Sequence, residues 1–174
     1  MNSPEEQFAD GYLFYALTRG LNFQIEEDLR QAVKSYELTF PSFRLLWFLY
    51  FEDNLTMTNL TYLSQTNMSN VYRQLEKLRE EGLVTIHTSR KQDTRAKKVG
   101  ITKSGRTYIK NFLNEHIEKS NIKIIQALAQ IPHEDFMKYI EVSSLLCNDL
   151  LGESFSNFIQ NSYEEVSKQS SSTS

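Results

Sequence analysis

The chain has 174 residues, of which 40% are hydrophobic, and its formal net charge is −3. This size suits one domain, or one compact domain with an added helical layer, and the small number of glycines and prolines favours long regular elements. No apolar run approaches the roughly 18 residues that a membrane-spanning helix needs, and the chain does not open with a basic and then apolar leader. The single cysteine, Cys147, excludes an intrachain disulfide framework. We therefore expect a cytoplasmic protein that has no membrane partner.

Charge is unevenly distributed along the chain. Between Thr66 and Lys110 there are eleven basic and four acidic residues, so this segment carries +7 and the remainder carries −10. A basic segment on an acidic body is typical of a surface that binds phosphates. The alternative is a solvated helix face with ordinary charge scatter, which is the weaker interpretation of a local excess of this size.

The first fifty residues predict two helices. Between Phe8 and Val33, leucine, isoleucine and valine recur at intervals of four, which is the spacing of one face of a long amphipathic helix. Thr39 can cap a second helix, with Pro41 in its first turn, that continues through an apolar run to Phe51. That run also fits a strand, but the proline at its start favours a helix.

The segment after residue 54 predicts a helix-turn-helix. Thr58 can cap a small third helix, and Asn67 or Met68 opens a fourth helix that ends before Gly82. In such a motif the first residues of the second helix face the major groove of DNA, where polar side chains and arginine can read base edges. The alternative is a capped surface helix with no ligand. The predicted reading residues are Asn67, Met68, Ser69, Asn70, Tyr72, Arg73 and Gln74.

A hairpin with a basic tip follows the fourth helix. Alternating residues predict one strand over 84–88 and a second over 97–101. A cation-rich tip can reach a minor groove or the flanking phosphates. Asp93 can hold this tip in shape by pairing with an arginine, either Arg95 or one elsewhere. The predicted DNA-binding residues of this wing are Arg90, Lys91, Asp93, Arg95, Lys97 and Lys98.

The C-terminal third predicts two further helices and a tail. Thr102 can cap a helix whose apolar stripe continues to Ile131, for nearly thirty residues, until Pro132 breaks it. A last helix is expected over 135–158. The serine-rich composition of the end of the chain predicts a disordered tail over 161–174.

Four motifs stand in order along the chain: 38–46 at the start of the second helix, 69–73 with 77–84 in the fourth helix, Asp93-Thr94-Arg95 in the wing, and Ile101-Thr102-Lys103-Ser104-Gly105 before the next helix. Together they resemble those of the MarR family of winged-helix transcription regulators, and the likeness covers nearly all of the chain except the tail. Gln65, in the turn, stands where the family usually has glycine, and Tyr72, at the DNA face, stands where a small residue is common.

This resemblance implies a mainly α-helical protein with a small β-hairpin, in which a winged helix-turn-helix lobe is joined to a helical dimerisation layer. The expected organisation is an N-terminal dimerisation helix over 1–36, a DNA-binding lobe over 37–104 and C-terminal dimerisation helices over 105–160. It implies a homodimer that binds double-stranded DNA and acts mainly as a repressor. By the same resemblance Arg95 would enter the minor groove and Asp93 would orient an arginine.

A small-molecule effector is a further partner that the resemblance suggests. The candidate residues of an effector pocket are Tyr36, Phe40, Phe43, Trp47 and His116, although aromatic residues at helical spacing are more often core. Cys147 lies among leucines and is expected to be a buried, inert thiol. The scattered histidines predict no metal site, and the absence of a nucleophile motif or a phosphate-binding loop predicts neither a cofactor nor an enzyme.

The sequence also fits a second function. A winged-helix module that senses an effector or binds another protein, without specific affinity for DNA, would have the same helix order. The concentration of cations at the wing tip favours the DNA-binding interpretation, because a protein-binding wing does not need them.

Overall fold

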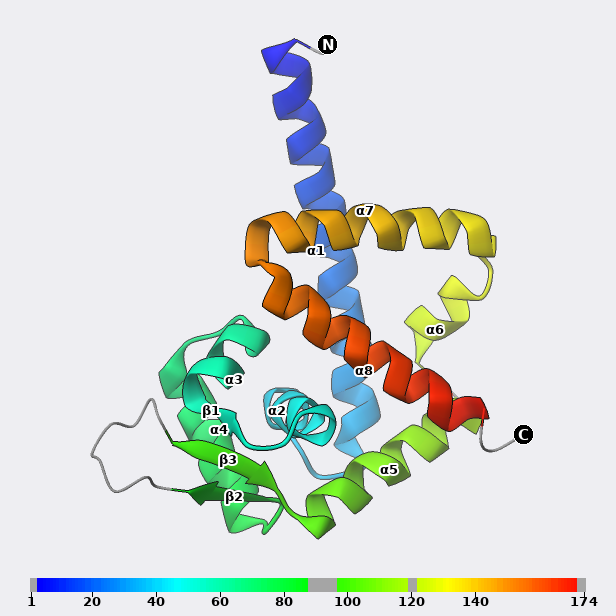
Figure 1. Ribbon diagram of the computed structural model, residues 1–174. Helices are drawn as coiled ribbons and strands as arrows, with labels where there is room; N and C mark the ends of the chain where they lie inside the picture. The colour runs from blue at the N-terminus through cyan, green and yellow to red at the C-terminus, as the bar shows by residue number, and fades with distance from the viewer. Residues whose placement is uncertain (1–2, 88–96, 119–121, 172–174) are drawn as a thin grey trace.

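The computed structural model describes residues 3–87, 97–118 and 122–171 of the chain. In Figure 1 the long helix α1 extends past the other elements, a lobe of short helices and strands lies at lower left, and α7 and α8 form an antiparallel pair. The elements in chain order are α1 Pro4–Lys34, α2 Phe40–Phe51, β1 Leu55–Thr56, α3 Met57–Ser64, α4 Met68–Glu80, β2 Val84–His87, β3 Lys98–Ile101, α5 Lys103–Glu118, α6 Lys123–Leu128, α7 His133–Leu151 and α8 Glu153–Ser171.

Side-chain caps set the helix starts in the lobe. The hydroxyl of Thr39 accepts a hydrogen bond from the Ser42 amide at 3.3 Å, as the sequence predicts for the start of α2. The third helix begins earlier than expected, because Thr56 rather than Thr58 is its cap and accepts from the Asn59 amide at 3.1 Å. Gly82 ends α4 with a φ of +70°, a conformation that glycine adopts without the steric cost that a side chain brings.

The strands form a three-stranded antiparallel sheet instead of the predicted two-stranded hairpin alone. The strand order is β1-β3-β2, with Leu55 opposite Val99 and Val84 opposite Ile101. The strand that pairs with β1 lies some forty residues away, beyond the reach of local sequence patterns. Helices α2 to α5 pack with this sheet around one core, whose fully buried side chains include Leu45, Leu46, Leu49, Met57, Leu60, Leu75, Leu78 and Ile109.

The C-terminal helices differ from the prediction. The expected single helix of nearly thirty residues is wrong: α5 ends at Glu118, and a separate short helix, α6, starts at Lys123. The expected last helix is divided at Gly152, whose φ of +92° does not continue a helix. The spacing of apolar residues is the same in one helix as in two consecutive helices, so it does not locate such breaks.

The predicted disordered tail over 161–174 is also wrong as far as residue 171, where α8 ends. The reason is tertiary packing of α8 on the lobe. The ring of Phe158 meets that of Phe48 edge-on at 5.5 Å, and Phe155 meets Tyr62 at 6.2 Å. Tyr62 also donates a hydrogen bond to the Leu151 carbonyl at 2.5 Å. The packing continues into the serine-rich segment, where Ser162 is buried and Val166 packs against the core, so a segment that its composition alone would leave unfolded is ordered.

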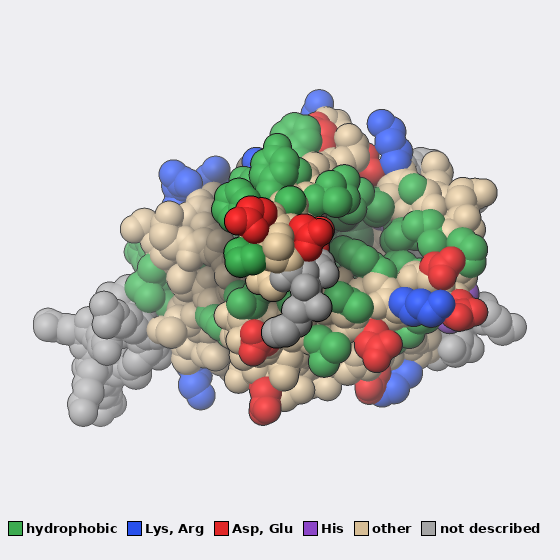
Figure 2. All heavy atoms as spheres, turned by 90° about the horizontal axis from the view of Figure 1, so that it is seen from above, with side chains coloured by type: hydrophobic (Ala, Val, Ile, Leu, Met, Phe, Trp, Pro, Cys, Tyr) green, Lys and Arg blue, Asp and Glu red, His purple; other side chains and the backbone are tan. Residues whose placement is uncertain are grey.

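Two helices carry large apolar side chains that the described parts of the chain leave uncovered. On α1 the exposed set includes Leu13, Leu17 and Leu21, and on α7 it includes Leu145 and Leu150. Figure 2 shows hydrophobic side chains gathered around the end of α1 that faces the viewer. Cys147 on α7 is only half-buried, so the expectation of a fully buried thiol is corrected. Within the described residues, no helix combines the length and apolarity needed to cross a membrane.

Candidate nucleic-acid interface

The helix-turn-helix is formed by α3 and α4, joined at Gln65. Gln65 adopts the left-handed conformation, with a φ of 49°, at the position where glycine was expected from the resemblance. A side chain in this conformation costs on the order of 1–2 kcal/mol. Two local bonds support the turn: the side-chain amide of Gln65 donates to the Tyr62 carbonyl at 2.6 Å, and the buried Ser64 hydroxyl donates to the Leu60 carbonyl at 2.5 Å. The turn therefore keeps its shape without the glycine.

The start of α4 presents a polar face to solvent. Of the predicted reading residues, Ser69, Tyr72 and Arg73 are exposed on the helix, and Asn67 is exposed at its N-cap, where its side chain accepts from the Asn70 amide at 2.9 Å. The opposite face carries the fully buried Val71, Leu75 and Leu78. This division leaves one side of the helix free to contact a ligand while the other side anchors it.

Three predicted reading residues are placed differently. Gln74 is only 6% exposed and hydrogen-bonds to α2, so its predicted direct contact with bases is corrected. Its position explains this, because it lies three residues after Val71 and four before Leu78, in the stripe that faces the core. Met68 packs partly against the core, and Asn70 is half-buried behind Arg73.

The base of the wing lies beside this face. The Lys97 ammonium lies 5.9 Å from the centre of the Tyr72 ring, a cation–π contact that joins the wing to α4. Lys98 is exposed and pairs with His87 and Thr56 across the sheet. The other predicted wing residues, Arg90, Lys91, Asp93 and Arg95, lie outside the described residues.

The predicted effector residues do not form one group. The rings of Tyr36, Phe43, Trp47 and His116 all surround Phe112, with centroid distances between 4.4 and 6.4 Å, and this cluster belongs to the core. Phe40 instead lines a cavity on another side of α2.

Tyr36 holds its proton in this cluster. Burial, together with a hydrogen bond that its hydroxyl donates to the Glu115 carboxylate, raises the pKa of Tyr36 to about 12. The hydroxyl is therefore neutral at physiological pH. The arrangement resembles a core cluster more than a ligand site, and an effector pocket at these residues remains a prediction.

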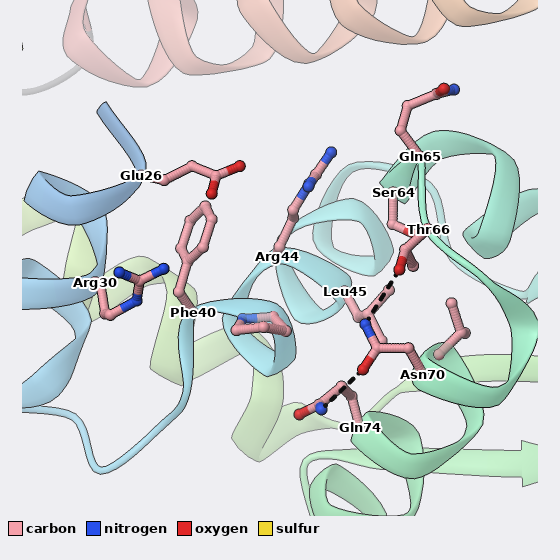
Figure 3. Close-up of a pocket in the computed structure, with 12 residues that line it drawn as sticks. Glu26, Arg30, Phe40, Arg44, Leu45, Ser64, Gln65, Thr66, Asn70 and Gln74 are labelled. Atoms are coloured by element: carbon pink, nitrogen blue, oxygen red, sulfur yellow. Dashed lines mark hydrogen bonds between the residues drawn. The ribbon is translucent and has the colours of Figure 1, made fainter. Parts of the chain in front are cut away.

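Sequence reasoning missed a cavity of about 190 Å³ between α1, α2 and the turn before α4. Figure 3 shows Glu26 and Arg30 from α1, Arg44 from α2 and Asn70 and Gln74 from α4 around it. Burial lowers the pKa of the Arg44 guanidinium, and the charge of Glu26 opposes that effect. These residues are dispersed between positions 26 and 74 of the sequence, and no local pattern relates them.

Known proteins share the sequence and the architecture of this chain in part. No protein-family model matches the chain. It is 22% identical over 154 residues to the HTH-type transcriptional regulator Hpr of Bacillus pumilus, covering 87% of this chain and 73% of that protein. A MarR family transcriptional regulator from Silicibacter pomeroyi DSS superposes with a TM-score of 0.63 at 28% identity, covering 85% of this chain and 94% of that one. The chain has the MarR-type winged-helix fold.

A third protein shares the MarR-type fold with this chain. The S. aureus MepR chain in a complex with DNA superposes with a TM-score of 0.64 at 21% identity, over 79% of this chain and 98% of MepR. The MarR resemblance predicted from four sequence motifs and the mainly helical winged fold are therefore confirmed.

Proposed function

We propose that the chain is a transcriptional regulator that binds double-stranded DNA in a sequence-specific manner. The main support for this proposal is the exposed polar start of α4, which carries Tyr72 and Arg73. It lies next to Lys97, a positively charged residue where the wing joins the sheet. On this proposal α4 enters the major groove and the wing reaches the minor groove. The fold supports it, as do the name of the Bacillus relative, a transcriptional regulator, and the DNA bound to MepR.

The regulator would act as a homodimer. Exposed apolar side chains on α1 and α7 support this, because monomeric soluble proteins rarely leave such large apolar surfaces uncovered. The predicted share of α5 is smaller, since Ile109, Phe112 and Leu113 are buried within the same chain. A twofold dimer would present two α4 helices to half-sites about 34–36 Å apart. Such a dimer on a promoter would exclude polymerase, so repression is the proposed mode of regulation.

Affinity for duplex DNA of random sequence should fall steeply with salt. If the wing and α4 contact several phosphates, raising the salt from about 50 to 200 mM should weaken binding by roughly 10³-fold. Binding releases counterions from the DNA, and this release is less favourable when the salt concentration of the solution is high. Fluorescence anisotropy with a labelled duplex measures this directly. A flat salt response, or no binding at low salt, would favour the alternative of a protein-binding or effector-sensing module.

Arg73 should determine sequence preference rather than overall affinity. Substituting Arg73→Ala should cost about 1–3 kcal/mol at one base pair of the preferred site if the guanidinium makes a bidentate contact with a base. Arg79→Ala is the matched control, because it removes the same charge from the same helix six residues later, where Arg79 pairs with Glu76. Competition binding with single-base variants of a site selected from random DNA gives the comparison. An equal loss on every sequence would reduce Arg73 to a phosphate contact.

A further inference from the structure

A buried polar network lies behind the reading face of α4. Gln74 is 6% exposed and Ser42 of α2 is 1% exposed. The Gln74 side-chain oxygen accepts hydrogen bonds from the Ser42 hydroxyl at 2.8 Å and from the Thr39 hydroxyl at 3.1 Å. Both donors belong to the capped first turn of α2, which the core holds in place. The carbonyl end of the Gln74 side chain is therefore fixed.

Asn70 links this network to the surface. Its side-chain oxygen accepts hydrogen bonds from the side-chain NH₂ of Gln74 at 3.4 Å and from the Arg73 guanidinium at 2.8 Å. The side-chain NH₂ of Asn70 donates to the Thr66 hydroxyl at 3.2 Å. Figure 3 shows the bonds from Asn70 to Thr66 and to Gln74 on the wall of the cavity. Rotating the Asn70 amide by half a turn would set its NH₂ group against two donors, so the network allows one orientation.

The polar character of position 74 indicates a role beyond stability. The position lies in the apolar stripe of α4, with Val71 one turn before it and Leu78 one turn after it. An apolar side chain would fit the helix pattern there, whereas a buried amide loses stability wherever a hydrogen bond is imperfect. Gln74 is also near the surface that reads DNA, one residue from Arg73.

We propose that Gln74 is a positioning residue for base recognition. Held by Ser42 and Thr39, it orients Asn70, and Asn70 in turn holds the Arg73 guanidinium in the orientation that reads a base. Bidentate recognition by arginine depends on the orientation of its planar fork, and a fixed acceptor behind the fork reduces the orientations that must be lost on binding. Only one N–H of the bonded guanidinium nitrogen is used by Asn70, so the other stays available to a base. This inference rests on the proposed DNA-binding function.

The test measures base discrimination, defined as the dissociation constant for the site in which the base pair read by Arg73 is changed, divided by the dissociation constant for the preferred site. Gln74→Met keeps the length of the side chain and helix propensity but removes both hydrogen-bonding groups. We expect it to lower this ratio by about fivefold or more, which is the lower end of the value of one bidentate contact. Binding to random duplex should be unchanged. In an Arg73→Ala background, Gln74→Met should have no further effect on the ratio.

A second variant changes a buried residue, which has almost no exposed surface with which to contact DNA. Ser42→Ala removes one bond to Gln74 from the buried end of the network, and we expect a smaller loss of discrimination at the same base pair. Its control is Ser162→Ala, which also removes a buried hydroxyl but one on α8, where it donates to the Phe158 carbonyl at 2.8 Å. Ser162→Ala should change thermal stability and leave the ratio as it is. Ser42→Ala decides the outcome if Gln74→Met does not fold.

The possible results separate the two proposals. If the wild-type chain shows no preference for any duplex over random DNA, the proposed function fails. If the wild type discriminates and both network variants keep that discrimination, the positioning role of Gln74 is overturned while the function stands. A further loss caused by Gln74→Met in the Arg73→Ala background would also overturn it, because Gln74 would then act independently of Arg73.

Discussion

Of the glycine-to-alanine substitutions in this chain, Gly105→Ala should destabilise the fold most. A Cβ atom at Gly105 would lie 2.4 Å from the Leu83 carbonyl oxygen, 2.8 Å from Ile101 and 3.2 Å from Leu46. The first of these neighbours is backbone, so it cannot turn aside as the end of a flexible side chain can. Inserting volume into a packed site typically costs about 1–3 kcal/mol, and we expect the upper part of that range.

The position of Gly105 explains why the contact is so close. The hydroxyl of Thr102 donates to the Gly82 carbonyl at 2.8 Å and accepts from the Gly105 amide at 3.1 Å. The amide of Thr102 donates to the Leu83 carbonyl at 3.0 Å. The first turn of α5 is thus drawn against the chain that leaves α4. This arrangement explains the motif from Ile101 to Gly105. Thr102 holds the first turn of α5 by hydrogen bonds, and Gly105 allows that turn to lie close to the Leu83 carbonyl.

Thermal or urea unfolding measures the effect. For a chain of this length, 3 kcal/mol corresponds to a fall in Tm of roughly 6–12 °C. Ser104→Ala is the control, since Ser104 is the exposed preceding residue on the same helix turn and alanine favours helix. Equal stability of the two variants would mean that α5 can shift away from the sheet at little cost.

Placing charges on the exposed stripe of α1 should convert a dimer into a monomer. The leucines 13, 17 and 21 continue at intervals of four into Leu29 and Val33, which lie against the core of the same chain. The C-terminal end of this stripe on α1 therefore packs against the same chain. The N-terminal end of the stripe is left exposed by the residues that the structure describes. We infer that a second copy covers the remainder.

The double variant Leu13→Glu/Leu17→Glu tests this. Sedimentation or light scattering should report a particle of 20.3 kDa for the variant and twice that mass for the wild type. Affinity for a site with two half-sites should fall by about 10²–10⁴-fold, because the second half-site is no longer bound intramolecularly. The control is Asn22→Glu, which adds a negative charge at a polar, exposed position that faces away from Leu17 on the helix. This variant should stay dimeric. A monomeric wild-type chain would contradict the inference.

Local signals in the sequence predicted much of the lobe. Thr39, Asn67 and Gly82 act on the turns next to them, so their roles as caps are visible without tertiary information. The same holds for the buried face of α4, because Val71, Leu75 and Leu78 repeat at the helix period. The exposed face that contains Arg73 follows from that repeat by exclusion.

Other features needed the folded chain. The burial of Gln74 follows from the helix spacing of α4, yet its hydrogen-bond partners depend on where the start of α2 lies, more than thirty positions earlier. The break between α5 and α6 was missed because apolar spacing is the same in one bent helix as in two packed ones. The order of α8 depends on the rings of Phe48 and Tyr62, which a composition rule cannot include.

The sequence alone thus determined the order of elements from α2 to β3 apart from the pairing of β1, most of the helix caps, the MarR-like motifs and the concentration of positive charge around the wing, because each depends on residues close together in the chain. Only the tertiary structure decided what Gln74 is bonded to, how Asn70 and Arg73 are held from behind, and which apolar stripes remain uncovered. These depend on packing between segments that are distant in sequence, where the partner of a residue is set by the fold and not by its neighbours.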